Sequence, residues 1–300
     1  MYRLCLISAL FIVSVLMISL AACFDSDNDT GNGEVERVIS LAPSNTEILF
    51  ALGLEDRVVG VTEYCNFPPE AEEKAKVGGF SEVDMEKVIS LSPDLIVAAD
   101  LHKDSVVPEL ERRGMEVLTL APKTLEEVLD GIKLLGQRTG KGKEANELVY
   151  DMEMRIDTVK EKVSSLTEEE KPRFVTLVWH DPIYASGPQT LQGQLLEIAG
   201  GINIGYGLEH GPMGLETLIE RDPEVIIANT GHGDSRDSII NWVKSEPRLR
   251  ETQALKNDRV YQIDTDVFGR AGPRIVDALE LIARFLHPEI FGQPAGEDSK

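Results

Sequence analysis

The sequence predicts an α/β fold with two Rossmann-like lobes, which contain mostly parallel sheets and are joined by a single long bridging α-helix. Short apolar runs alternate with helical patterns, an uninterrupted helical pattern occupies the middle of the chain, and two segments at an offset of 130 residues are similar. A length of 300 residues also lies where single cores give way to two domains. We therefore expect an N-terminal lobe (37–140), a bridging helix (141–166) and a C-terminal lobe (167–291).

The chain begins like a lipoprotein signal peptide. Arg3 precedes an apolar run over residues 4–20, and Ala21-Ala22 leads directly into Cys23. This pattern predicts that residues 1–22 are removed and that Cys23 is lipidated, which would hold the protein at the cell membrane on the extracytoplasmic side. The alternatives are a plain secretory signal or an uncleaved anchor helix, for which the run is a little short.

Composition limits the remaining possibilities. The chain has 52 acidic and 30 basic residues, a net charge of -22, so no nucleic-acid partner is expected. Once residues 1–22 are lost and Cys23 is acylated, Cys65 is left without a disulfide partner, and we expect it in the core. Residues 23–36 predict a flexible acidic stalk, and 292–300 a flexible tail.

The expected helices have recognisable ends. Ser44-Asn-Thr-Glu47 and Thr124-Leu-Glu-Glu127 have the form of capping boxes, and the first of these helices should stop at Gly53. Lys143–Leu166, with apolar residues every three or four positions, predicts a helix of roughly 35 Å. A surface helix of one lobe is the alternative. A final helix should follow Pro273. The expected strands are Val38–Leu41, Val58–Val61, Leu95–Ala98, Val117–Leu120, Phe174–Val178, Val225–Ala228 and Val260–Ile263.

Aromatic and histidine side chains follow several of these strands, where α/β lobes bind ligands. Catalytic signatures such as G-x-S-x-G, a P-loop or H-E-x-x-H are missing from the sequence, so we do not expect an enzyme. The aromatic residues favour a flat, partly apolar ligand between the lobes, although each alone is also typical of a core. The histidines either bind a metal or are loop residues that are solvated or bonded to the backbone. The residues are Tyr64, Phe80, Trp179, Tyr184 and Phe268, with His102, His180, His210 and His232.

Several segments together carry a family resemblance. They resemble, in order, the cobalamin/ferric-siderophore class of periplasmic substrate-binding lipoproteins of ABC importers, and most of all its vitamin B12-binding branch. The likeness covers roughly 37–286. It implies the helical-backbone fold of that class and no enzymatic activity. The segments are RVISLAPSNTEILFALG (37–53), VVGVTEYCNFPP (58–69), VGGF (77–80), YASG (184–187), AGGINI (199–204) and FGRAGPR (268–274).

The resemblance also implies a function and partners. A monomer would capture a corrinoid in the cleft between its lobes, with no cofactor of its own, and deliver it to the permease subunits and their ATPase. A ferric siderophore or haem on the same scaffold is the alternative, as is a metal bound by the four histidines. An envelope hydrolase or redox enzyme is a further rival, for which no nucleophile–base pair stands out.

Residue roles follow from matching positions. The resemblance implies that Tyr64 and Phe80 pack on the corrin, that Tyr184 faces it from the C-terminal lobe, and that Asp266, Phe268 and Arg270 form the rim. Ser44 and Asn45 would face the cleft from a helix N-terminus. Two tryptophans of the B12-binding branch correspond to Ala99 and His210, so His210 is a candidate contact to the ligand or its metal.

One acidic residue in each lobe matches the family's docking sites. Glu86 and Glu216 occupy equivalent places in the two similar segments, and the resemblance implies that they bind arginines of the permease. The alternative is that each only complements the dipole of its own helix.

Overall fold

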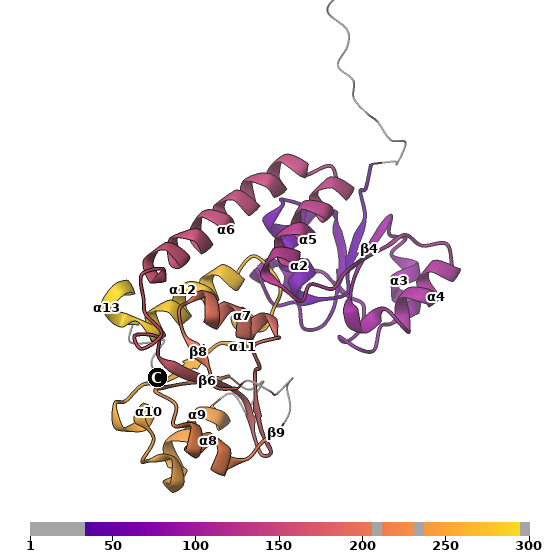
Figure 1. Ribbon diagram of the computed structural model, residues 1–300. Coiled ribbons are helices and arrows are strands. Elements are labelled where there is room, and N and C mark those ends of the chain that lie inside the picture. Colours follow the sequence, from indigo (N-terminus) through magenta and orange to yellow (C-terminus); the bar gives the residue numbers. More distant parts are fainter. Residues whose placement is uncertain (1–33, 206–211, 231–236, 295–300) are drawn as a thin grey trace, which may run out of the picture. The chain divides into compact units, whose positions relative to one another are not determined.

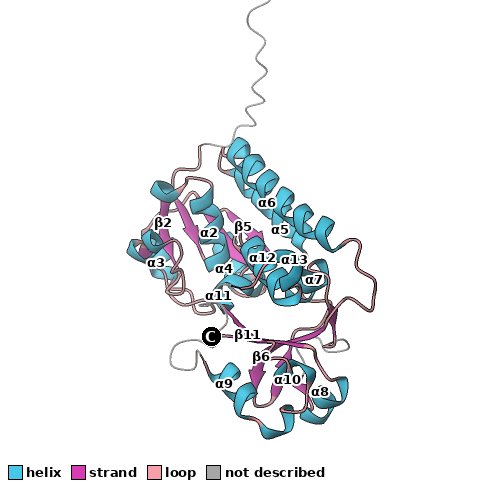
Figure 2. Ribbon diagram, turned by 90° about the vertical axis from the view of Figure 1, so that its left-hand side faces the viewer, coloured by secondary structure: helices cyan, strands magenta, loops and turns pink. Residues whose placement is uncertain are grey.

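The computed structural model of the protein describes residues 34–205, 212–230 and 237–294. One compact unit begins at Val35, and it contains two β-sheets with helices packed on both faces of each (Figures 1 and 2). Cys23, His210 and His232 lie outside the described residues. Among the described helices, none combines the length and hydropathy needed to cross a membrane.

The first sheet is parallel throughout, in the order β3-β2-β1-β4-β5. Because both faces are covered, its strands are apolar on both sides, as expected for a parallel sheet. Leu95 and Val97 point into one core and Ile96 and Ala98 into another. The elements are β1 (Val38–Ser40), α2 (Pro43–Ala51), β2 (Val58–Val61), β3 (Ala75–Lys76), α3 (Met85–Ser90), β4 (Leu95–Ala99), α4 (Val106–Arg112), β5 (Val117–Leu120) and α5 (Leu125–Arg138), with short 3-10 turns at Glu55–Arg57, Pro69–Glu73 and Asp100–His102.

The second sheet is mixed, in the order β11-β10-β6-β7-β9, with β8 also paired to β6. Strands β6, β7 and β9 are antiparallel neighbours, whereas β10 and β11 run parallel to β6. Helices α8, α9 and α10 cover one face of this sheet (Figure 2). The elements are β6 (Arg173–His180), β7 (Ile183–Ala185), α7 (Leu191–Ile198), β8 (Ile202–Asn203), β9 (Pro212–Met213), α8 (Leu215–Arg221), β10 (Val225–Asn229), α9 (Ser238–Ser245), a 3-10 turn (Pro247–Leu249), α10 (Gln253–Lys256), β11 (Val260–Ile263), α11 (Thr265–Phe268), α12 (Ile275–Leu286) and α13 (Pro288–Phe291).

The long helix expected in the middle of the chain is confirmed as α6 (Gly142–Val163), which ends three residues before the expected Leu166. It packs against α5 and α12 (Figure 1). Arg155 of α6 bonds to Asp277 and Glu280 of α12 at 2.6–2.9 Å. The helix therefore connects the half of the chain that forms the first sheet with the half that forms the second.

Both sheets share one apolar core. Val38 of the first sheet, Met152 of α6 and Val225 of the second sheet belong to a single buried cluster, to which α2, α5, α7 and α12 also contribute. Since well-packed interiors resist deformation, a wide separation of the two lobes would have to disrupt this core.

Local expectations were partly right. Thr124 caps α5, since its hydroxyl accepts the N–H of Glu127 at 3.1 Å. Cys65 is buried as expected, with the hydroxyl oxygens of Thr46 and Thr62 each 3.1 Å from its sulfur. The short strands β3, β7, β8 and β9 were not anticipated, because two or three residues leave no readable periodicity.

The prediction of a capping box at Ser44 is wrong. Helix α2 begins two residues earlier, with Ala42 as its N-cap and Pro43 in its first position, and no side chain caps it. Proline suits this position because its fixed φ is helical and it has no N–H to satisfy. The Glu47 carboxylate, expected to close the box, instead pairs with Arg270 and Arg274.

Candidate functional site

A cavity of about 1390 Å³ opens at the carboxyl ends of strands from both sheets. In the first sheet the strand order reverses between β1 and β4, and the segments after these two strands supply Ser44 and Asp100. In the second sheet the residues after β10 and β11 supply Thr230 and Thr265. Connections on either side of such a reversal diverge and leave a crevice, which is where open α/β sheets bind ligands.

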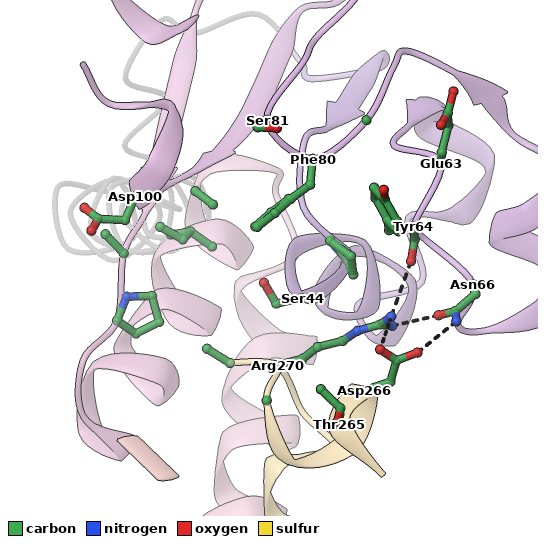
Figure 3. A pocket seen from close by; sticks show the side chains of 18 of the residues that line it. Ser44, Glu63, Tyr64, Asn66, Phe80, Ser81, Asp100, Thr265, Asp266 and Arg270 are labelled. Atoms are coloured by element: carbon green, nitrogen blue, oxygen red, sulfur yellow. Dashed lines mark hydrogen bonds and ion pairs between the residues drawn. The ribbon is translucent and has the colours of Figure 1, made fainter. Parts of the chain in front are cut away.

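Two aromatic rings form one wall of the cavity (Figure 3). Tyr64 follows β2 and is 60% exposed, and Phe80 lies in the loop before α3 and is 40% exposed. Two large rings left this open to solvent beside a cavity are expected to cover an apolar ligand surface.

A hydrogen-bonded network crosses the floor of the cavity (Figure 3). Arg270 donates to the Asn66 side-chain oxygen at 2.8 Å and to the Tyr64 carbonyl at 3.3 Å, and its guanidinium lies 2.8 Å from an Asp266 carboxylate oxygen. The Asn66 amide donates to the other Asp266 oxygen at 2.9 Å. These bonds join the loop after β2 to helix α11 and the segment that follows it, so they hold the two lobes together.

A buried carboxylate lies beneath this network. Glu47 of α2 has 2% of its side chain exposed, and it accepts two bonds from Arg274 (2.9 and 2.6 Å) and one from Arg270 (3.1 Å). The Arg274 guanidinium also lies 3.9 Å from the centre of the Phe67 ring. Burial alone would lower the pKa of Arg274, but its bonds to Glu47 together with the negative charges of Glu47, Asp266 and Asp264 outweigh that effect and raise the pKa above its usual value.

The described lining of the cavity has an excess of negative charge. Five of its residues are acidic and two are basic, and one of the two, Arg270, is already paired with Glu47 and Asp266. A ligand rich in carboxylates would therefore be repelled, whereas neutral amide N–H groups would find acceptors. The charged residues are Glu63, Glu82, Lys123, Asp100, Asp264, Asp266 and Arg270.

The structure brings together five of the expected ligand-binding residues. Ser44, Tyr64, Phe80, Asp266 and Arg270 all line the same cavity (Figure 3).

The other expected residues lie elsewhere. Asn45 is buried, and its amide donates to the carbonyl groups of Val97 and Ala98 at 3.3 and 3.0 Å, so it fastens α2 to β4. Phe268 is fully buried in the shared core. Tyr184 of β7 is half-buried and is not among the described residues that line the cavity. His210 lies outside the described residues.

The alternative of a metal bound by the histidines is not supported at His102. Its Nδ1 accepts the Ala99 N–H at 3.0 Å and its Nε2 lies 2.7 Å from the Phe80 carbonyl oxygen, so neither nitrogen is available to a metal. The His180 ring is near the rings of Trp179 and Trp242, at centroid distances of 5.1 and 5.7 Å. Within the described ranges, His, Cys, Asp and Glu form no group of three or more that could hold a metal ion.

Sequence reasoning missed Asn66 and Glu47. Asn66 lies two residues after Tyr64 in the same loop after β2, which is a readable signal for a polar residue at the site. In the sequence Glu47 resembles an ordinary acidic residue near the start of a helix, and nothing local reveals that it is buried against two arginines.

Comparison with known proteins identifies the family. The model of the periplasmic binding protein family matches residues 38–267. The chain belongs to this family. The ABC transporter substrate-binding lipoprotein YvrC of Bacillus subtilis, itself uncharacterised, is 32% identical over 86% of this chain and 82% of its own length.

Solved structures of the family share the fold. The vitamin B12-binding protein BtuF of Vibrio cholerae is 28% identical, with a TM-score of 0.71 over 84% of this chain and 96% of its own. A possible iron-binding protein of Staphylococcus epidermidis is 29% identical, with a TM-score of 0.73 over 85% and 99% of the two chains. The expected two-lobed α/β class is thereby confirmed.

The two acidic residues expected to dock occupy equivalent places in this family member. Glu86 lies in the first turn of α3, which leads into β4, and Glu216 lies in the first turn of α8, which leads into β10. Both are exposed, and Glu216 lies 3.9 Å from Arg248.

Proposed function

We propose that the protein is the substrate-binding component of an ABC importer and that it carries a corrinoid. Its family membership and the names of its relatives, among them the vitamin B12-binding protein of Vibrio cholerae, support the transport role. Binding and release, without covalent chemistry, constitute the mechanism.

We choose a corrinoid as the ligand because the cavity combines an aromatic wall with a floor that is acidic and contains a side-chain amide. A corrinoid has broad apolar faces, which suit Tyr64 and Phe80, and a periphery of neutral amides, which suit Asp266 and Asn66. The cavity of about 1390 Å³ exceeds the range of roughly 300–1000 Å³ that drug-sized ligands occupy. Haem presents two carboxylates, and these would face the excess of acidic residues.

Calorimetric titration of the full-length protein with cyanocobalamin, haemin and ferrichrome tests the ligand. We expect cyanocobalamin to bind most tightly, and the variant Phe80→Ala to weaken its binding by roughly 3- to 10-fold. The matched control is Tyr150→Ala, which removes a 65% exposed ring from α6, outside the described lining of the cavity. Tight binding of haemin or ferrichrome without binding of cyanocobalamin would refute the corrinoid assignment.

We further propose that Glu86 and Glu216 dock onto basic residues of the permease, with one contact from each lobe. Their exposure, their equivalent positions and the acidity of the chain support this role. Lipidation at Cys23 would keep the protein at the extracytoplasmic face of the membrane. Incorporation of labelled palmitate that persists in Cys23→Ser would contradict that anchor.

A further inference from the structure

His102 lies directly behind the aromatic wall of the cavity. It ends the 3-10 turn that follows β4, and its side chain is fully buried. Its ring packs edge-on against the ring of Phe80, with 5.8 Å between the centroids and an interplanar angle of 83°.

The hydrogen bonds of His102 define its state. The backbone N–H of Ala99 is always a donor, so Nδ1 must be the acceptor of the 3.0 Å bond between them. The proton is therefore on Nε2, which donates to the Phe80 carbonyl oxygen at 2.7 Å. A neutral ring with this one tautomer satisfies both bonds, and burial lowers the pKa of His102, which favours the neutral form.

Phe80 needs such support because it lies at the tip of a loop. The base of the loop is closed by a bond from the Gly79 N–H to the Glu82 carbonyl at 2.9 Å and by the bridge between Gly78 and Val83. Neither of these contacts involves Phe80 itself. Among the described residues, the bond from His102 is the hydrogen bond that ties Phe80 to the remainder of the lobe.

We propose that His102 is a positioning residue for ligand binding: it fastens the tip of the 78–83 loop to the end of β4 and so holds the Phe80 ring against the cavity. The inference rests on the proposed function, since it takes the Phe80 ring to contact the ligand. Holding an exposed ring in place before binding reduces the entropy lost when the ligand orders it. Removal of His102 should therefore weaken binding through Phe80.

A double-mutant cycle tests this coupling in the full-length protein, with cyanocobalamin and haemin as probes. His102→Leu should weaken binding of the probe that wild type binds by roughly 3- to 10-fold, as expected for loss of an aromatic contact. In the Phe80→Ala background the same change should alter affinity by less than about 2-fold. His102→Gln, which keeps a donor and an acceptor, should recover most of the affinity. An equal loss in both backgrounds would overturn the inference.

A matched control separates positioning from general loss of stability. His287 is also buried, and its Nε2 lies 3.1 Å from the Gly200 carbonyl oxygen, in residues that do not line the cavity. His287→Leu should reduce stability without weakening probe binding.

A measurement without ligand tests the contact between His102 and the loop separately from the proposed function. Amide hydrogen exchange in residues 78–83 should become faster in His102→Leu and remain unchanged in His287→Leu. If wild type binds neither probe, the proposed function fails, and exchange still decides whether His102 holds the loop. Unchanged exchange in His102→Leu would overturn the positioning role.

Discussion

The substitution Glu47→Gln should destabilise the protein strongly, because the Glu47 carboxylate is the buried counter-ion of two arginines from the other lobe. Three hydrogen bonds of 2.6, 2.9 and 3.1 Å end on its two oxygens. Glutamine has nearly the same shape and keeps one acceptor oxygen. The variant therefore tests the charge and the second acceptor rather than the packing.

The expected loss is about 3 kcal/mol, at the lower end of the 3–5 kcal/mol range for breaking a buried ion pair. The lower end applies because both arginines keep other partners: Arg270 retains Asp266 and Asn66, and Arg274 retains the face of Phe67. In a chain of this size such a loss corresponds to a fall in the unfolding midpoint of about 5 °C.

Thermal and urea unfolding of wild type and Glu47→Gln measure this loss. The matched control is Glu109→Gln, which removes the charge from another glutamate that bonds to two arginines, Arg112 and Arg113, but at the surface. Exposed pairs contribute little, so the control midpoint should barely move. A change of less than about 1 kcal/mol in Glu47→Gln would show that the inter-lobe pair does not stabilise the fold in the way its burial implies.

Three other outcomes follow from individual residues. Burial lowers the pKa of His102 from its ordinary 6.5. The contribution of the neutral His102 ring to stability should therefore be complete above pH 6.5 and be lost as the pH falls toward the lowered pKa. Urea unfolding at pH 7.5, 6.5 and 5.5 should show this decline in stability, and His102→Gln should make the decline smaller. Gly78→Ala should lower the free energy of unfolding by about 1–3 kcal/mol, because residue 78 has φ +106° and a Cβ there would lie 2.4 Å from a carbonyl oxygen. Gly79→Ala is the control, since the nearest atoms to a Cβ at residue 79 are 3.9 Å away. The double variant Glu86→Ala with Glu216→Ala should leave cyanocobalamin affinity unchanged and reduce its uptake by cells; normal uptake would exclude the docking role.

Phe268 and Glu47 show why the site could be predicted only in part. Phe268 follows a strand, as the cavity residues do, yet its side chain turns into the shared core. Glu47 falls in the first turns of a helix, yet it pairs with arginines more than 220 residues away in sequence. Loop position and residue type are local properties, whereas the direction of a side chain and its distant partners depend on how the lobes pack.

The amino-acid sequence alone predicts the α/β class, the bounds of β2, β5 and β11, the long helix α6 and the burial of Cys65. Apart from the burial of Cys65, which follows from its lack of a disulfide partner, these features follow from periodicity and apolar runs, which act over a few residues. Three features depend on packing across the molecule: Tyr64, Phe80 and Arg270 meet in one cavity, Glu47 joins the lobes, and His102 supports the aromatic wall. These contacts require a particular strand order and one core shared by both sheets, and no short stretch of the chain encodes either of them.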